Sequence, residues 1–203
     1  MKKLSRDFYN RDTITVAQEL LGKYLVHKVD GEELAGKIVE VEAYKGPLDK
    51  AAHSYNNRRT SRNEVMYGEA GYAYVFIIYG MYDCMNVVTT EKERPEAVLI
   101  RALEPVKGID KMAANRFGKE LTELNKREYK NLTNGPGKLG KAMKITRALN
   151  GEDLLGDRLY ITEGHVEKLE IVTSKRIGID YAEEAIDFPW RFYIKDNKFV
   201  SKI

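Results

Sequence analysis

The residues of this chain whose types and spacing could support catalysis gather around Glu42, with Tyr44 two positions later and His53 a further nine. The segment Ile38–Tyr44 alternates apolar side chains with Glu40 and Glu42, so a strand here would turn one face to a core and carry both acids on the other. Such a strand end presents a carboxylate, a phenol and an imidazole to one place, which suits a catalytic carboxylate. The alternative is that both acids are simply solvated, and the alternation by itself favours that alternative.

Arg101 is a second charged residue in an unexpected place, because it interrupts the apolar run Ala97–Leu103. The run predicts a buried strand, and a charge inside a buried strand needs a partner of opposite sign. The candidate partners are Glu40, Glu42 and Glu104.

Two runs rich in aromatic and β-branched residues flank Tyr79-Gly80-Met81 and predict a β-hairpin over residues 72–88. Its tip would carry Tyr79, Met81 and Tyr82. Because exposed side chains of this size cost free energy, an exposed tip suggests that it inserts into a partner. The alternative is a tip that folds back onto the core.

Turn and cap residues predict the remaining elements. Asp30-Gly31 is a strong hairpin-turn signal, so Tyr24–Val29 and Leu34–Tyr44 are expected to pair as antiparallel strands. Lys45–Asn63 is a long polar loop with one short helical turn. The other predicted elements are a helix over Thr13–Leu21 with a Thr15/Gln18 capping box, a short helix over Asn63–Tyr67, helices over Ile109–Phe117, Leu121–Tyr129 and Pro136–Lys144, the strand Ala97–Leu103 ended by Pro105, and short strands near Arg158–Ile161, Leu169–Val172 and Arg191–Ile194.

Length and composition indicate one domain over residues 1–203. A hydrophobic content of 43% and a charged content of 32% suit a soluble globular protein. No apolar run is long enough to cross a bilayer, and the N-terminus lacks the apolar stretch of a signal peptide. Cys84 is the only cysteine and the three histidines have no metal-ligand spacing, so we expect no disulfide, no metal site and a reducing cytoplasmic setting.

Basic residues are unevenly distributed along the chain. Residues 50–62 carry four basic side chains and no acid, and residues 107–147 hold 11 basic and 4 acidic residues, a net charge of +7. Residues 148–203 hold 8 basic and 11 acidic residues, a net charge of −3. This distribution is typical of a protein that binds a polyanion, although an ordinary solvated helix surface is an equal alternative for the 107–147 block. Lys138 follows a Gly-Pro-Gly turn at a predicted helix start, where a phosphate could bind.

The candidate residues match no familiar nucleophile arrangement of the Ser/His/Asp or Cys/His type, and the chain has no glycine-rich nucleotide loop. A strand-end carboxylate, an imidazole, several aromatic rings, a buried arginine and a basic loop are suited to another task. They could extrude a base from nucleic acid, stack it between aromatic rings and direct a water at its sugar. The candidates are Glu42, Tyr44, His53, Phe76, Tyr79, Asn86 and Arg101.

Nine segments, spread over nearly the whole chain, match the segments of one protein family and follow the same order: Val41–Tyr44, His53-Ser54, Arg58–Asn63, Ile77–Tyr82, Cys84–Asn86, Leu99–Pro105, Gly135–Leu139, Arg176–Gly178 and Arg191–Tyr193. In these segments the chain resembles the alkyladenine (3-methyladenine) DNA glycosylases of the methylpurine type. The resemblance implies a mixed α/β (α+β) single domain with a curved, mostly antiparallel sheet, a protruding β-hairpin and surrounding helices. It also implies a bacterial member that lacks a regulatory N-terminal tail.

The same resemblance implies a monomeric, monofunctional glycosylase of base excision repair that needs no cofactor and flips alkylated or deaminated purines out of duplex DNA. Glu42 would be the general base that activates a water, and Arg101 would pair with Glu42 and help hold that water. Phe76 stands where the family usually has a tyrosine, which keeps the stacking surface and loses a hydroxyl. The other implied roles are a base pocket (Tyr44, His53, Phe76, Asn86), a wedge in the duplex (Tyr79) and contacts with DNA phosphates (Arg58, Thr60, Arg62, Lys138).

Two other functions remain open on the sequence. A non-catalytic protein that recognises distorted DNA or RNA would share the basic loop and the aromatic tip, but it does not need a carboxylate among phosphates. A small-molecule hydrolase that uses Glu42 and His53 would account for neither the tip nor the loop. Base release from damaged duplex DNA without added metal would distinguish these functions.

Overall fold

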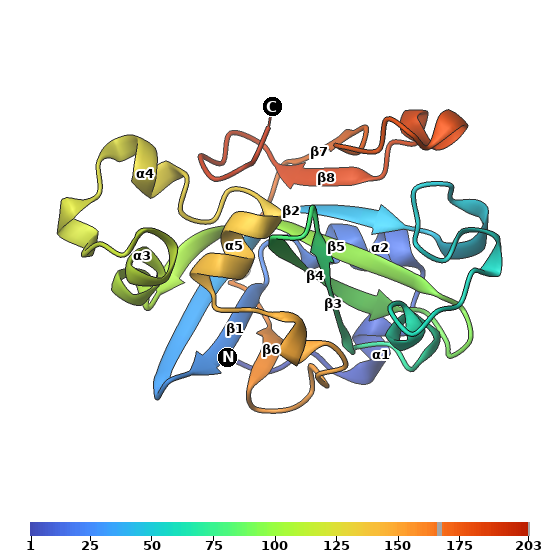
Figure 1. The fold of residues 1–203 in the computed structure, drawn as a ribbon, viewed down its shortest axis with the longest axis horizontal. Helices are drawn as coiled ribbons and strands as arrows, with labels where there is room; N and C mark the ends of the chain where they lie inside the picture. Colours follow the sequence, from blue (N-terminus) through green and yellow to red (C-terminus); the bar gives the residue numbers. More distant parts are fainter. Residues whose placement is uncertain (166–167, 203) are drawn as a thin grey trace.

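A curled antiparallel sheet of eight strands forms the centre of the structure, a computed structural model that describes residues 1–165 and 168–202 (Figure 1). The predicted fold class, mixed α/β with a curved antiparallel sheet, is confirmed. The strands are β1 (Tyr24–Val29), β2 (Glu32–Tyr44), β3 (Ala73–Ile78), β4 (Tyr82–Thr89), β5 (Glu96–Lys107), β6 (Leu159–Thr162), β7 (Ile171–Ser174) and β8 (Arg191–Ile194). The α-helices are α1 (Arg6–Tyr9), α2 (Thr13–Leu20), α3 (Ile109–Phe117), α4 (Lys126–Lys130) and α5 (Pro136–Ala142).

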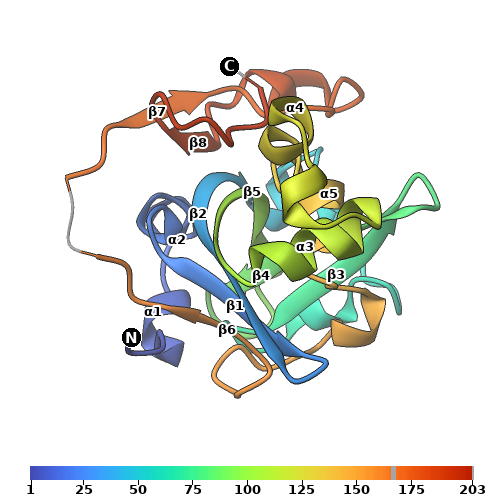
Figure 2. The same cartoon turned by 90° about the vertical axis from the view of Figure 1, so that its left-hand side faces the viewer.

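Strand β2 is the central strand of this sheet. The sheet runs in the order β3-β4-β5-β2-β1-β6, and β8 also pairs with β2 while β7 pairs with β8. β1 pairs with residues 32–37 of β2 and β8 pairs with residues 40–42, so β1 and β8 share one edge of β2. Figure 2 shows β7 and β8 together at one end of the molecule, beside β2. The acidic end of β2 therefore lies between β5 and β8.

An irregular register between β2 and β5 positions the charged residues of both strands. The register shifts on both sides of Glu40, which leaves Val39 on β2 and Arg101 on β5 without a directly opposed residue. Bulges of this kind bend a strand and change the direction of its side chains. As a result, Arg101 on β5 reaches Glu40 and Glu42 on β2.

Both predicted hairpins are confirmed. Asp30 and Gly31 join β1 to β2 with positive φ values of 54° and 76°. Tyr79, Gly80 and Met81 join β3 to β4, and Tyr79 and Gly80 have φ values of 52° and 69°. Two successive positive φ values match the type I′ turn, whose twist suits the two-residue connection between β1 and β2. At the second turn this geometry places a tyrosine in a conformation that bulky residues rarely adopt.

Helices pack closely on the sheet. α2 lies against β2 and β5, and α5 lies against β4 and β5. A Cβ atom added to Gly137 would come within 2.7 Å of the ring of Tyr82, and one added to Gly140 within 2.5 Å of the carbonyl oxygen of Asp83. These glycines therefore allow α5 to approach β4, which gives the Gly-Pro-Gly turn a packing role in addition to the predicted phosphate site.

The capping prediction for α2 is wrong. Asp12 is the N-cap, and its carboxylate accepts hydrogen bonds from the backbone N–H groups of Ile14 and Thr15. The acceptor therefore lies three residues before Thr15, the residue that was expected to cap the helix. An aspartate directly before the first helical turn satisfies the free N–H groups at that end.

Two element boundaries also differ from the prediction. β5 continues through Pro105 to Lys107, because Pro105 lies opposite Gly36, where the β2–β5 register shifts and the ladder is already irregular. The helix predicted over Leu121–Tyr129 is split, because Asn125 caps a new helix, α4. The short 3-10 helices are Gly46–Leu48, Tyr55–Asn57, Glu64–Tyr67, Leu121–Glu123, Arg147–Leu149 and Glu183–Asp187.

Candidate active site

A cavity of about 410 Å³ opens between the β3–β4 hairpin, the loop after β2, the start of α5 and the β7–β8 connection. The fold brings most of the predicted site residues to this cavity. Those that line it are Tyr44, His53, Arg62, Phe76, Tyr79, Asn86, Arg101 and Lys138. A mostly apolar cavity with several aromatic rings and a few polar groups is the usual form of a small-ligand site.

Glu42 lies directly behind two residues that line the cavity. Its side chain is fully buried, and one carboxylate oxygen, Oε2, accepts hydrogen bonds from Tyr44 Oη at 2.9 Å and Arg101 Nη1 at 3.2 Å. The other oxygen, Oε1, accepts from the backbone N–H of Ile177 at 2.7 Å. The strand-end acid is therefore not solvated, and three hydrogen-bond donors hold its carboxylate in place.

Arg101 pairs with both acids of β2. Its Nε donates to Glu40 Oε1 at 3.0 Å and its Nη1 donates to Glu42 Oε2. Burial by itself would lower the pKa of Arg101, but the carboxylates of Glu42 and Glu40 outweigh it and raise the pKa, so the guanidinium stays charged. Two of the three predicted partners are confirmed. The third, Glu104, instead accepts a hydrogen bond from Asn197.

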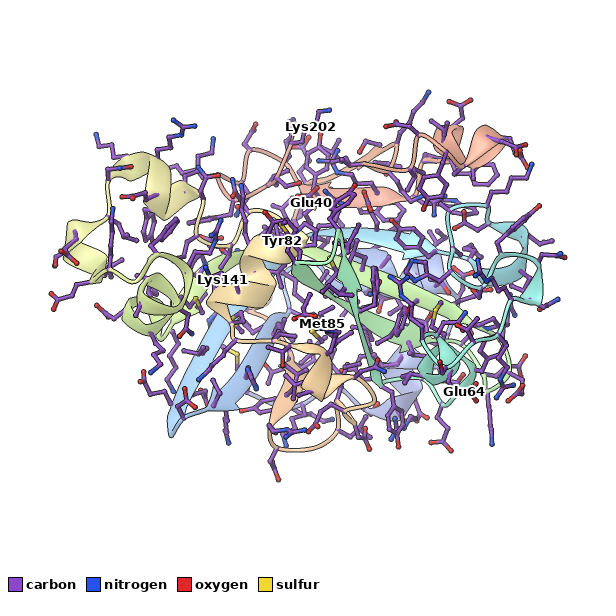
Figure 3. All side chains as sticks on the ribbon, viewed as in Figure 1. Glu40, Glu64, Tyr82, Met85, Lys141 and Lys202 are labelled. Atoms are coloured by element: carbon purple, nitrogen blue, oxygen red, sulfur yellow. The ribbon has the colours of Figure 1, made fainter. Side chains whose placement is uncertain are left out.

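The burial of Glu40 contradicts the expectation that this residue is solvated. Its side chain has no exposed surface, and its carboxylate contacts Arg101, Arg191 and Ser201. Figure 3 labels Glu40 on β2 below the segment that ends at Lys202. Alternation along β2 correctly placed both acids on one face, but β8 and the segment after it cover that face and exclude water.

The aromatic wall of the cavity contains Tyr74, a ring that sequence reasoning missed. Tyr74 Oη lies 2.8 Å from His53 Nδ1, and the Asn86 amide donates to the Tyr74 carbonyl at 3.1 Å. The rings of His53 and Phe76 meet edge to face, with centroids 4.5 Å apart. Tyr74 lies two residues before Phe76 on β3, and this period-2 spacing could have revealed it.

The tip of the β3–β4 hairpin forms one rim of the cavity. Tyr79 is 77% exposed and Met81 is 68% exposed. Figure 2 shows this hairpin tip projecting from the body of the molecule. The exposed tip is confirmed, and a tip folded back onto the core is excluded. In chemical terms the site combines a buried pair of carboxylate and arginine with a cavity that can stack a flat ring.

Comparison with known proteins identifies the family. A model of the methylpurine-DNA glycosylase (MPG) family matches residues 7–198. This chain belongs to the methylpurine-DNA glycosylase family. It is 62% identical over 203 residues to a protein of Clostridium novyi (strain NT), with 100% of both chains covered, and 59% identical over 201 residues to one of Desulfitobacterium hafniense (strain Y51), with 99% of both covered. Both relatives are named "Putative 3-methyladenine DNA glycosylase".

Family membership confirms the resemblance seen in the nine sequence segments. It also confirms the predicted enzyme class, because DNA glycosylases are hydrolases of DNA repair that cleave the N-glycosidic bond between a base and its deoxyribose. DNA is therefore the substrate.

The basic residues of this glycosylase lie at different distances from the cavity. Arg62 lines it, with its guanidinium 5.2 Å from the centre of the Phe76 ring and a hydrogen bond to the Ile77 carbonyl at 2.9 Å. Lys138 also lines it, and its Nζ donates to the amide oxygens of Asn131 and Asn134. Burial lowers the pKa of Lys138. Arg58 and Thr60 are exposed on the loop, away from the cavity wall.

A buried ion pair that sequence reasoning did not identify supports the site. Arg176 donates to both carboxylate oxygens of Asp49, at 2.5 and 2.8 Å, and both side chains are fully buried. Arg176 also donates to the Ala43 carbonyl, and its guanidinium lies 4.8 Å from the centre of the Tyr44 ring. The next residue is Ile177, whose N–H reaches Glu42. The pair therefore joins the loop after β2 to the β7–β8 connection.

Acid should destabilise this glycosylase partly through His53. Burial, together with Arg62 and Arg58, lowers the pKa of His53 to about 4, from about 6.5 in an unfolded chain. Between these pH values the unfolded chain binds more protons, so the free energy of unfolding falls as pH is lowered through this window. We expect His53→Gln to remove this part of the pH dependence. Urea midpoints of both proteins between about pH 7 and about pH 4 would measure it.

A matched control for this measurement is His165→Gln, because His165 is exposed. This control should keep the pH dependence of the wild type. A difference between wild type and His53→Gln that stays constant with pH would contradict the prediction.

Two other classes of site were sought in residues 1–165 and 168–202. In this part of the chain no group of three His, Cys, Asp or Glu side chains could hold a metal ion. None of its helices is both long enough and apolar enough to cross a membrane.

Proposed function

We propose that this protein flips alkylated or deaminated purines out of duplex DNA and hydrolyses their N-glycosidic bond, leaving an abasic site. The observation that carries the proposal is the buried pair of Glu42 and Arg101 directly behind the wall of an aromatic cavity. A protein that only binds DNA gains nothing from a buried carboxylate beside its binding site. A hydrolase requires such a group to accept a proton from water.

In the proposed reaction a water oxygen bonds to C1′ of the deoxyribose while the bond from C1′ to the purine nitrogen breaks. The electron pair of the broken bond leaves with the base, and Glu42 accepts the proton of the water. Arg101 contacts Glu42 and also lines the cavity. It is therefore the group that could hold the water beside Glu42. The three donors to Glu42 hold its carboxylate in position for this transfer.

The flipped base would stack in the aromatic cavity on Tyr44, His53 and Phe76. Alkylated purines are electron-poor, and some carry a positive charge, so they interact well with the faces of aromatic rings. Because the pKa of His53 is about 4, its imidazole is neutral at physiological pH and does not repel a cationic base. Asn86 would exclude the exocyclic amino group of guanine.

The surface around the cavity suits duplex DNA. Tyr79 is exposed at the hairpin tip, where it would fill the gap that the flipped nucleotide leaves. Arg58, Thr60, Arg62 and Lys138 would contact phosphates on either side of the lesion. Each cation that neutralises a phosphate would contribute to the salt dependence of binding.

We also infer that residues 1–203 act as one domain and as a monomer, without a cofactor. The single sheet that joins the first strand to the last supports one domain. Lys138 is the lysine among the described residues that line the cavity, and its Nζ is bound by two asparagine side chains. This arrangement favours hydrolysis over attack by a lysine, so we expect no lyase activity.

The proposed function predicts base release from a panel of duplexes. Each duplex carries one 3-methyladenine, 7-methylguanine, hypoxanthine or ethenoadenine, and a duplex of the same sequence without damage is the control. With a chelator present, the protein should release at least one of these bases and leave an alkali-sensitive abasic site. Binding to damaged duplexes without release of any base would contradict the proposal and favour a non-catalytic binder.

A further inference from the structure

Glu40 has no part in the proposed chemistry, yet four donors surround its buried carboxylate. Oε1 accepts from Arg101 Nε at 3.0 Å, Arg191 Nε at 2.7 Å and Ser201 Oγ at 2.8 Å. Oε2 accepts from the backbone N–H of Ser201 at 2.6 Å. A buried carboxylate with this many partners is held in one position.

Arg101 connects this carboxylate to the site. Its Nε bonds Glu40 and its Nη1 bonds Glu42, so one guanidinium bridges the two acids. A guanidinium is rigid and planar, and fixing the direction of Nε therefore also fixes where Nη1 points. Glu40 thus binds Arg101 through Nε, whereas Glu42 is bound by Nη1.

The charges of this cluster are balanced. Glu40 and Glu42 carry two negative charges, and Arg101 and Arg191 carry two positive charges. Arg191 has further partners of its own, because it donates to Ser174 Oγ and to the backbone carbonyl of Lys202. Loss of the charge on Glu40 would remove the carboxylate that Arg191 pairs with and would leave Arg101 paired with Glu42.

A purely structural role for Glu40 is the simpler alternative. Glu40 could serve only to attach β8 and the segment that contains Ser201 to β2. The contacts of Arg191 and Ser201 would be sufficient for that role. They leave unexplained why Glu40 also binds the one arginine that reaches Glu42 and lines the cavity.

We propose that Glu40 is a positioning residue for base hydrolysis, because it holds Arg101 in the single orientation that serves Glu42. The inference rests on the proposed function. Ser201 completes the arrangement by covering Glu40, so residues far apart in sequence support the site from behind. Glu40 touches neither the substrate nor the water.

The test is Glu40→Gln, which keeps the shape of the side chain and removes its charge. We expect the single-turnover rate of base release to fall about 10- to 100-fold, the scale expected when a reacting group is misplaced by about 1 Å. The dissociation constant for a duplex with a tetrahydrofuran abasic-site analogue should change less than about twofold, because Glu40 does not contact DNA. A rate within about threefold of wild type would overturn the proposal.

Glu96→Gln is a matched control, because it removes another buried carboxylate from the same sheet. Glu96 lies on β5 and binds Thr13 and Arg94, with no contact to Arg101. This variant should lose thermal stability and keep the wild-type single-turnover rate. An equal loss of rate in both variants would assign Glu40 a structural role only.

A second measurement does not depend on activity. The ¹⁵N NMR signal of Arg101 Nε should shift in Glu40→Gln and stay unchanged in Glu96→Gln. An unchanged signal in Glu40→Gln would overturn the positioning role, even if the wild-type protein released no base and the proposed function failed.

Discussion

Glu42→Gln should reduce the rate of base release by about 10²- to 10⁴-fold, the range that a positioned general base contributes. Glutamine has nearly the same shape as glutamate but cannot accept a proton from the attacking water. The variant should still bind damaged duplex DNA, because Glu42 is buried behind Tyr44 and Arg101 and is not among the residues that line the cavity. The measurement is single-turnover base release, expressed per folded protein.

Glu104→Gln is the control for this experiment. Glu104 was the third candidate partner of Arg101, but its side chain instead binds Asn197. Its replacement should leave the rate within about twofold of wild type, as expected for a residue outside the site. If Glu42→Gln retained base release, the assignment of Glu42 as the general base would be wrong.

Asp49→Ala should lower the free energy of unfolding by about 3–5 kcal/mol, the cost of breaking a buried ion pair by removing one partner. The loss leaves the guanidinium of Arg176 buried without its carboxylate. It also removes the acceptor for the backbone N–H groups of Lys45 and Ala51. Urea unfolding at neutral pH would measure the change.

Asp187→Ala is the matched control for stability. Asp187 pairs with Lys175 on the surface, where the two side chains are 72% and 64% exposed. Surface pairs contribute about 0–1 kcal/mol, so this variant should be nearly as stable as wild type. A loss below about 1 kcal/mol in Asp49→Ala would mean that the buried pair contributes no more than a surface pair does.

Asp49→Ala also has an expected consequence for the site. Arg176 lies next to Ile177, whose N–H donates to Glu42, and its guanidinium contacts the ring of Tyr44. A displaced Arg176 would disturb two of the three donors to Glu42. The site therefore depends on an ion pair that lies outside the cavity.

Local signals in the sequence determined the elements that carry the site. Asp30-Gly31 predicted the first hairpin, because a turn with two positive φ values favours a short list of residue types. The two β-rich runs that flank Tyr79-Gly80-Met81 predicted the second hairpin. The rule that a charge in an apolar strand needs a partner predicted that Arg101 binds an acid, with Glu40, Glu42 and Glu104 as the candidates, and Arg101 binds the first two. These inferences depend only on residues that are neighbours in the sequence, or on the requirement that a charge in a buried strand has a partner.

Only the tertiary structure decided what covers each face of a strand. The alternation along β2 placed Glu40 and Glu42 together, but it could not show whether water or protein lies above them. Arg191 and Ser201, 151 and 161 residues from Glu40, provide that cover. The role of Arg176 was missed for the same reason, since its partner Asp49 is distant in sequence. Burial depends on long-range packing. Because both acidic residues of β2 are buried, they pair with Arg101, which holds Glu42 at the site.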